Sequence, residues 1–156
     1  MHKDSFSILV IIYLPIGNGL QIESMHGVLS VYNLPEIIST LFTIFVVIVI
    51  TNGFNLIDGI DGLASGIGIL ASLSFGIVAY LMKQFDMTLI AFTLMGSLLA
   101  FLKYNFHPAR IFMGDTGSLV IGMLLSVLAI NIIKNGFVTE TIKLPDKGPL
   151  LAIVFL

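Results

Sequence analysis

Carboxylate, amide and glycine residues interrupt an otherwise apolar sequence at residues 51–64, which read TNGFNLIDGIDGLA. Asn55, Asp58 and Asp61 follow one another at a spacing that would place them on roughly one face of a continuous helical turn. Only Leu, Ile and Gly lie between them, and carboxylates this close repel one another unless they share a proton or a cation. The stretch predicts an ion- or phosphate-handling site where two membrane helices meet water. The alternative is a solvated turn between helices that is acidic by chance.

A second polar stretch follows at residues 105–118, which read NFHPARIFMGDTGS. Asp115 and the Thr-Gly-Ser after it are typical of a helix start, where free backbone N–H groups and the helix dipole favour an anionic phosphate. Arg110 and His107 add positive or hydrogen-bonding character to the same stretch. Together these residues predict a phosphate-binding loop that leads into a helix.

Two amides and one aromatic ring complete the candidate ligand contacts. Asn55 and Asn105 offer amides to a sugar or to the edge of a base, and Phe112 offers a face on which a planar ring could stack. With a phosphate-binding loop beside them, these groups suit a diphosphate that is bridged by a metal ion near a lipid headgroup.

Simpler structural roles are the alternatives for the residues of the second stretch. Asp115 could be a plain helix cap, and Arg110 could contact lipid headgroups. His107 precedes a proline and could be structural, while Phe112 could pack against a helix. A capping role for Asp115 would not exclude metal binding.

The composition places the chain in a membrane. Apolar residues make up 57% of the 156 residues and charged residues only 10%, with a mean hydropathy of +1.08, whereas an average soluble domain has about 25% charged residues. The net charge of −2 predicts no nucleic-acid partner, and a chain without cysteine has neither disulfides nor thiol chemistry. The length allows one domain at most, so residues 1–156 are predicted to form a single transmembrane domain.

The sequence predicts an all-α fold, a polytopic transmembrane helix bundle with four full spans. Each span is an uncharged run. A helix rises about 1.5 Å per residue and the hydrocarbon core is about 30 Å thick, so the length of each run decides whether it can cross the membrane. The spans are predicted at residues 37–57, 62–82, 87–102 and 117–133. Shorter apolar runs at residues 6–14 and 149–156 predict partial helices at both ends, and residues 15–36 predict an extramembrane hairpin or loop.

The order of spans and loops predicts which polar stretches meet. Two spans separate the loop at residues 52–61 from the loop at residues 105–116, so both loops open on the same side of the membrane. Asp58, Asp61 and Asp115 are therefore expected to converge in one cleft. Three carboxylates with glycines beside them suit a hard divalent cation, Mg2+ or alternatively Mn2+, which binds carboxylates together with substrate phosphates and water.

The two polar stretches together resemble a known family. NGFNLIDGIDGLASG and NFHPARIFMGDTGSL, in this order and with two spans between them, are similar to motifs of the polyprenyl-phosphate N-acetylhexosamine-1-phosphate transferases. The resemblance covers roughly residues 20–135 and is greatest to the undecaprenyl-phosphate N-acetylglucosamine-1-phosphate transferases of cell-wall and surface-polysaccharide synthesis. Ile57, Ile60 and residues 106–108 favour that branch over the phospho-N-acetylmuramoyl-pentapeptide transferases, which typically read NLTDGLDGL.

The resemblance implies an enzyme that transfers a sugar-1-phosphate. In this family the phosphate of a polyprenyl phosphate attacks the sugar-bearing phosphorus of a UDP-sugar, which yields a lipid-diphospho-sugar and UMP. Carried onto this chain, Asp115 would be a Mg2+ ligand, and Asp58 and Asp61 would complete the catalytic set beside the nucleotide-sugar. The implied substrate-binding residues are Asn55, His107, Arg110, and Asn105 with Phe112 at the uridine. In-line phosphoryl transfer needs positioning and charge neutralisation more than covalent chemistry, which agrees with these residue types.

The implied partners are a UDP-sugar, a polyprenyl phosphate lipid and the membrane itself, and a homodimer is compatible with the resemblance. The implied location is the bacterial plasma (inner) membrane, with the active-site loops in the cytosol, where UDP-sugars are made. The count of basic residues gives the opposite orientation. Lys103 and Arg110 lie on the side assigned to the cytosol, and the other side carries four lysines, Lys83, Lys134, Lys143 and Lys147.

Two features of the family are missing from this sequence. It contains no adjacent pair of aspartates upstream and no histidine-rich loop downstream of the two motifs. We therefore expect the chain to be an internal fragment of a longer transferase. We also expect that these 156 residues alone do not catalyse transfer.

A transporter or ion pathway is the alternative from another functional class, because acids beside helix-breaking glycines also mark such sites. A transporter site lies near the membrane midplane, whereas these acids are predicted at the ends of spans. The CDP-alcohol phosphotransferases also use Asp-Gly motifs, but within one extended motif on two adjacent helices. Here Asp115 lies two spans after Asp61.

Overall fold

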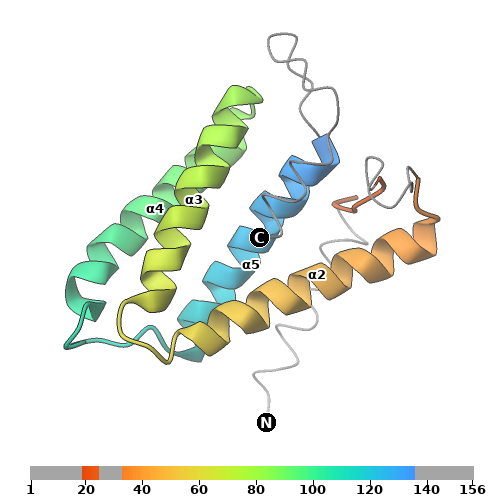
Figure 1. Cartoon of the computed structure of the whole chain (residues 1–156). Helices are drawn as coiled ribbons and strands as arrows, with labels where there is room; N and C mark the ends of the chain where they lie inside the picture. The colour runs from red at the N-terminus through yellow and green to blue at the C-terminus, as the bar shows by residue number, and fades with distance from the viewer. Residues whose placement is uncertain (1–18, 25–32, 136–156) are drawn as a thin grey trace.

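The computed structural model of the protein describes residues 19–24 and 33–135. Within these residues the fold is all-helical, as predicted, with four helices and no strand (Figure 1). The helices are α2 (Glu36–Ile57), α3 (Leu63–Leu81), α4 (Phe85–Asn105) and α5 (Gly114–Asn135). The partial helices predicted at residues 6–14 and 149–156 lie outside the described residues.

All four helices are long and apolar enough to cross a membrane. They contain 19 to 22 residues, and their most apolar windows have mean hydropathies of 1.8 to 2.2. The four predicted spans are therefore confirmed, although α4 is longer than predicted and α5 begins earlier, at Gly114. Many large apolar side chains point outward, as expected for surfaces that contact lipid; examples more than half exposed are Ile37, Leu41, Phe45 and Leu89.

Small residues allow α3 and α4 to pack closely side by side (Figure 1). The buried face of α3 carries a small residue in each turn: Ala64, Gly68, Ser72 and Gly76. A Cβ atom added at Gly68 would lie 2.7 Å from a methyl group of Leu98, and one added at Gly76 would lie 3.2 Å from the ring of Phe92. Close approach through small residues is a common way for membrane helices to associate, since lipid offers no hydrophobic driving force between them.

A second close pair is formed by α2 and α5, which cross at an angle (Figure 1). Gly122 of α5 lies directly against Thr51 of α2, where an added Cβ atom would stand 2.9 Å from the Thr51 Cα atom. Phe54 of α2 connects the two pairs, because it packs in one cluster with side chains of α3, α4 and α5, namely Ala64, Leu94, Leu98 and Leu125.

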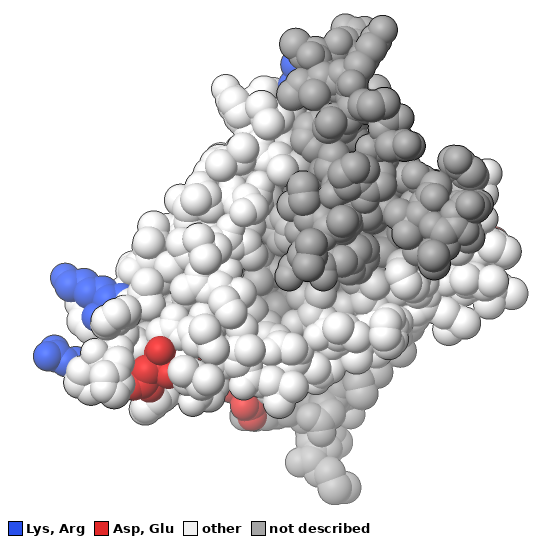
Figure 2. Space-filling view, in the orientation of Figure 1, with Lys and Arg blue, Asp and Glu red and all other residues white. Residues whose placement is uncertain are grey.

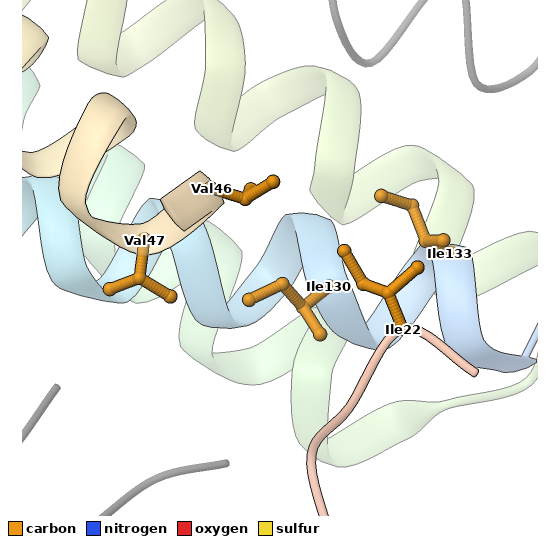
Figure 3. Packing of buried hydrophobic residues seen from close by; sticks show 5 residues of the cluster. All are labelled: Ile22, Val46, Val47, Ile130 and Ile133. Atoms are coloured by element: carbon orange, nitrogen blue, oxygen red, sulfur yellow. The ribbon is translucent and has the colours of Figure 1, made fainter. Parts of the chain in front are cut away.

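The segment at residues 19–24 packs against α2 and α5 at the end of the bundle where α2 begins and α5 ends. Figure 3 shows Ile22 of this segment among Val46 and Val47 of α2 and Ile130 and Ile133 of α5. All five side chains are buried. This part of the region predicted as an extramembrane hairpin is therefore held tightly on the helices.

The turn between α2 and α3 begins where the predicted span at residues 37–57 ends. Residues 52–57 were assigned both to that span and to a loop at residues 52–61; they form the last turns of α2, and a turn at residues 58–62 leads into α3. Gly62, the residue before α3, has a φ of 73°, a backbone conformation that favours glycine. Because α2 ends at Ile57, the expected single helical face of Asn55, Asp58 and Asp61 does not extend to Asp61.

Candidate active site

Both polar stretches lie at the same end of the bundle, as the count of spans predicted. The turn at residues 58–62 is hydrogen-bonded to the loop at residues 106–113 and to the first residue of α5. Figure 2 shows acidic and basic side chains near this end, on a surface that is otherwise mostly uncharged. Two spans of intervening sequence thus return the chain to the same place.

Asp61 anchors the loop at residues 106–113. Its Oδ2 atom accepts a hydrogen bond from the Ala109 amide at 3.1 Å and lies 3.1 Å from Nδ1 of His107. The Ala109 amide, and to a lesser degree the His107 ring, hold the pKa of the Asp61 carboxyl below its usual value. Asp61 is therefore ionised at neutral pH, and its partners come from the second polar stretch.

Asp58 reaches from the end of α2 to the start of α5. Its Oδ2 atom accepts a hydrogen bond from the Gly114 amide at 3.1 Å, so a carboxylate from the turn after α2 caps the first turn of α5. Partial burial raises the pKa of the Asp58 carboxyl, the Gly114 amide opposes this rise, and the charge of nearby Asp115 adds to it. The capping role considered for Asp115 is performed here by Asp58.

Asn55 and Ser118 make another polar contact between α2 and α5. Ser118 is fully buried, and its hydroxyl donates to Oδ1 of Asn55. The same hydroxyl lies 3.1 Å from the backbone carbonyl oxygens of Gly114 and Asp115. Ser118 was not among the predicted site residues, although its place about one turn after Asp115, at the predicted start of a helix, indicated where it would lie. The contact fixes the first turn of α5 against α2.

Asn105 is buried where α3, α4 and the loop at residues 106–113 meet, with only 3% of its surface exposed. Its Oδ1 atom accepts hydrogen bonds from the Gly62 amide at 3.1 Å and from the Ser65 hydroxyl at 2.9 Å. Its Nδ2 atom donates to the carbonyl oxygen of Ile111 at 3.0 Å. The side chain thus connects the end of α4 with the start of α3 and with the loop.

The remaining candidate residues face outward at this end of the bundle. Phe112 is 72% exposed, the His107 side chain is 82% exposed, and Arg110 and Asp115 are exposed as well. They lie on the loop and on the helix turn that Asp58, Asp61 and Asn105 hold in place. The candidate residues therefore fall into two groups. The first group holds the loop and the start of α5 in place: Asn55, Asp58, Asp61 and Asn105. The second group has exposed side chains: His107, Arg110, Phe112 and Asp115.

The acids form a pair and not a cluster of three. Nowhere in the described part of the chain are three or more His, Asp or Glu side chains grouped to hold a metal ion. The charges of Asp58 and Asp115 interact, whereas Asp61 is bonded to the loop. Mg2+ is often held by only one or two carboxylates together with substrate phosphates and water, so the pair fits such an ion.

The position of the charged residues distinguishes an interfacial site from a transport pathway. Within residues 33–135, the charged side chains of the four helices all lie in the first or last turn: Glu36, Asp86, Lys103, Asp115 and Lys134. α3 contains none. The transport pathway considered above would have its acids in the middle of these spans. The arrangement gives no support to a transporter.

Comparisons with known proteins identify a family and several relatives. The family model described as glycosyl transferase family 4 matches residues 1–133 of this chain. A protein of Rubrobacter xylanophilus named phospho-N-acetylmuramoyl-pentapeptide-transferase is 46% identical over 114 residues, which cover 72% of this chain and 32% of that protein. Proteins of the same name are 52% identical over 80 residues in Moorella thermoacetica, covering 51% and 25% of the two chains, and 45% identical over 89 residues in Enterococcus hirae, covering 57% and 28%.

The chain spans a third or less of the length of these curated relatives. These relatives carry the name of the phospho-N-acetylmuramoyl-pentapeptide transferases, whereas the motif residues favoured the N-acetylglucosamine branch. The preference for the N-acetylglucosamine branch is therefore not confirmed. The prediction of a membrane phospho-sugar transferase family is confirmed.

Proposed function

This chain belongs to glycosyl transferase family 4, and we propose that its described residues form part of a site that transfers a sugar-1-phosphate from a UDP-sugar to a polyprenyl phosphate. In this reaction an oxygen of the lipid phosphate bonds to the sugar-bearing phosphorus while the bond from that phosphorus to UMP breaks. Because the chain spans a third or less of its relatives, the proposal concerns the part of the site that these residues provide.

The observation that carries the proposal is the meeting of Asp58 and Asp115 at the first turn of α5. A helix start attracts phosphate through its free amides and its dipole. Two carboxylates beside the same turn repel an anion, so a phosphate can bind there only together with a cation that offsets their charge. A diphosphate with a bound divalent cation meets both conditions.

Asp115 is the residue proposed to hold Mg2+, with Asp58 next to it and with phosphate oxygens completing the coordination. Mn2+ takes the same type of oxygen ligand and is the alternative ion. The ion would supply charge neutralisation at the diphosphate. The chain's own part is to hold the two carboxylates together, which the Asp58–Gly114 and Asn55–Ser118 contacts support.

The exposed residues of the loop at residues 106–113 are proposed to contact the nucleotide. The Arg110 guanidinium suits a phosphate oxygen, and the ring of Phe112 suits stacking on uracil. His107 contacts Asp61 through Nδ1, which leaves Nε2 as a further candidate for a phosphate contact. Asp61 supports all three by anchoring the loop.

Two sugar phosphates are candidates for the transferred group. The names of the relatives favour phospho-N-acetylmuramoyl-pentapeptide. The motif residues Ile57, Ile60 and 106–108 favour N-acetylglucosamine-1-phosphate. We place the first candidate ahead, because identities of 45% to 52% over 80 or more residues outweigh a few motif positions.

The proposed location is the bacterial plasma membrane, with the site on the cytosolic side where UDP-sugars are available. The chain has no cysteine of its own, so Ala109→Cys introduces a single reactive group into the partly exposed loop. An impermeant thiol reagent should label this variant only after the membrane is opened. Labelling of intact cells would instead support the orientation that the basic residues give.

The direct test uses the native gene product that contains this chain, in membranes with undecaprenyl phosphate and Mg2+. Radiolabelled UDP-N-acetylmuramoyl-pentapeptide and UDP-N-acetylglucosamine are supplied separately, and lipid-linked label and UMP are measured. Transfer should be faster with the pentapeptide substrate. A preference for UDP-N-acetylglucosamine would select the second candidate, and an intact protein that transfers neither sugar would contradict the proposal.

A further inference from the structure

A basic side chain at the end of α4 has no carboxylate partner in the described part of the chain. Lys103 lies in the last turn of α4 and is exposed. The ion pairs among the described residues join His107 to Asp61 and Lys134 to Glu23. Figure 2 shows the basic side chains of this end at the outer edge of the bundle, apart from the acidic ones. The Lys103 ammonium group is therefore available to an anion outside these residues.

Two exposed aromatic residues lie beside Lys103. Its Nζ atom stands 5.9 Å from the centre of the Tyr104 ring, a distance at which a cation is attracted to the face of the ring. Tyr104 is 48% exposed, and Phe106, directly after α4, is 68% exposed. The Phe106 ring borders the turn before α3, because a Cβ atom added at Gly62 would lie 3.6 Å from it. A lysine and two exposed rings thus surround the end of one membrane span.

The position of these side chains suits the boundary between lipid and water. Tyr is enriched there because its ring contacts apolar groups while its hydroxyl remains hydrated. The methylene stem of a lysine lies along apolar surface while its ammonium group reaches the headgroups. The exposed ring of Phe106 has no polar atom, so entry into the lipid removes apolar surface from water.

The anions at this depth of a membrane are the phosphate groups of lipids, and the charge of Lys103 favours one type of headgroup. The phosphate of a zwitterionic lipid has a cation of its own beside it, which competes with the lysine. An anionic headgroup of the phosphatidylglycerol type has no such cation and is attracted to a basic residue at the membrane surface. An anionic phospholipid therefore matches both the charge and the exposed rings.

We propose that Lys103, Tyr104 and Phe106 form a binding site for an anionic phospholipid of the surrounding leaflet. The Lys103 ammonium group and the Tyr104 hydroxyl bind the phosphate, and the Phe106 ring lies against the glycerol and the upper part of the acyl chains. This lipid is not a substrate, and the site shares no residue with the nucleotide site proposed above. The proposal rests on the four membrane spans and does not depend on the transfer reaction.

Lys83 provides the matched control. It is exposed at the opposite end of the same pair of helices, in the turn between α3 and α4. The exposed residues Tyr80 and Phe85 are close to it in the sequence, but their rings contact one another edge to face, with centres 6.5 Å apart. Among the described residues, the cation–π contact is that of Lys103. A general attraction of lysines to an anionic leaflet would act on both residues, whereas a headgroup site acts on Lys103.

The test uses the native gene product in membranes that contain phosphatidylglycerol with a photoreactive group near its phosphate. After illumination, mass spectrometry of peptides measures the lipid bound at residues 103–106. Lys103→Gln should reduce this crosslink about fivefold, the effect of one basic residue near an anionic lipid surface, and Lys83→Gln should leave it unchanged. An equal reduction in both variants, or a reduction in neither, would overturn the proposal. So would an unsubstituted protein that shows no crosslink at these residues.

Competition identifies the source of the phosphate. Unlabelled phosphatidylglycerol should displace the photoreactive lipid from residues 103–106. Equal amounts of phosphatidylcholine or undecaprenyl phosphate should not displace it, and neither should inorganic phosphate. Displacement by undecaprenyl phosphate would assign Lys103 to the lipid substrate, and displacement by inorganic phosphate would show an anion site without a lipid. Either result would overturn the proposal.

Discussion

The two ends of the helix bundle use polar side chains in different ways. At the end where α2 begins, polar groups bind residues 19–24 to the helices. The Ile22 amide donates to the Thr43 hydroxyl at 3.0 Å, and the Ser39 hydroxyl donates to the Ile22 carbonyl oxygen at 2.9 Å. Lys134 of α5 donates to the Gly19 carbonyl oxygen and lies 3.4 Å from a carboxylate oxygen of Glu23. Each of these polar groups has a partner of opposite character within the protein.

The end that carries Asp58, Asp61 and Asp115 also has hydrogen bonds of this kind, but the charges of two of these carboxylates also repel one another. Asp61, Asn55 and Asn105 are engaged by neighbouring groups. Asp58 is bonded to the Gly114 amide as well, but burial, together with the like charge of Asp115, still raises the pKa of its carboxyl against the effect of that bond. The difference suggests a division of roles: polar groups that bond to one another stabilise the fold, and the like charges of Asp58 and Asp115 are the pair that we propose to bind a cation.

The largest effect is expected from removing one charge of the acidic pair. Asp115→Asn should reduce the transfer rate of the native gene product by about 100-fold or more, which corresponds to about 2.7 kcal/mol of transition-state stabilisation. Asp86→Asn is the matched control, because Asp86 lies in the first turn of α4 at the opposite end. Turnover near that of the unsubstituted protein in Asp115→Asn would remove this residue from the metal site.

The contact between α2 and α5 should be sensitive to one added methyl group. In Gly122→Ala the new Cβ atom would lie 2.9 Å from the Thr51 Cα atom. No change of side-chain rotamer can relieve this clash, because the Cα atom belongs to the backbone. We expect a loss of about 1–3 kcal/mol in the free energy of unfolding, with reduced activity because Asp58 directly follows α2 and Asp115 lies in α5. Gly96→Ala is the control, since its added Cβ would meet no atom within 4 Å beyond its chain neighbours and the backbone of its own helix. Equal thermal stability of the two variants would show that the helices do not meet here.

Substitutions at the opposite end of the bundle should lower the free energy of unfolding without changing the transfer reaction. Thr43→Val leaves the buried Ile22 amide without its acceptor, which should cost about 1–3 kcal/mol in the free energy of unfolding. Thr40→Val makes the same change at a partly exposed position, where the hydroxyl bonds to the Glu36 carbonyl oxygen of its own helix. Thermal unfolding should separate the two variants, and KM for the UDP-sugar should be the same in both. A raised KM in Thr43→Val alone would mean that residues 19–24 communicate with the site.

The smallest effects concern the pH dependence of Asp58 and Asp61, whose pKa values are shifted in opposite directions. The pKa of Asp61 is lowered in the folded protein, so its carboxylate stabilises the fold above the unfolded pKa, and this contribution is lost as the pH falls through the folded pKa. The pKa of Asp58 is raised, so its carboxylate costs stability at neutral pH, and the cost disappears as the pH falls through that raised value.

Two substitutions test these signs. Without divalent cations at pH 7, Asp58→Asn should melt at a higher temperature than the unsubstituted chain, and Asp61→Asn should melt at a lower one. Both differences should shrink in acid: the difference for Asp58 should shrink first, because its pKa is raised above the ordinary value of 3.8, and the difference for Asp61 should persist to lower pH, because its pKa is lowered. Shifts of the same sign in both variants would mean that the two acids share one environment.

The helices and the meeting of the two polar stretches were predictable from the sequence. Lipid requires long uncharged runs, so their number and approximate bounds can be read from composition. Counting these runs then placed Asp58 and Asp115 on one side of the membrane. This step needed no knowledge of how the helices pack.

The partners of the polar groups could not be predicted in the same way. That Asp58 caps α5 depends on the crossing of α2 and α5, which Gly122 permits. The burial of Asn105 depends on the turn at Gly62, where a helical pattern was expected to continue towards Asp61. Such contacts join residues far apart in the sequence, and periodicity describes only neighbours along one helix.

We propose that Asp58 and Asp115 together make their end of the bundle a cation-dependent nucleotide site. Hydrogen exchange of the chain with UDP tests it, with and without Mg2+, at residues 106–118 and at residues 19–24 and 33–43. UDP should protect residues 106–118 only when Mg2+ is present, and the residues at the opposite end should not respond. Equal protection without Mg2+, or protection confined to the opposite end, would contradict the claim.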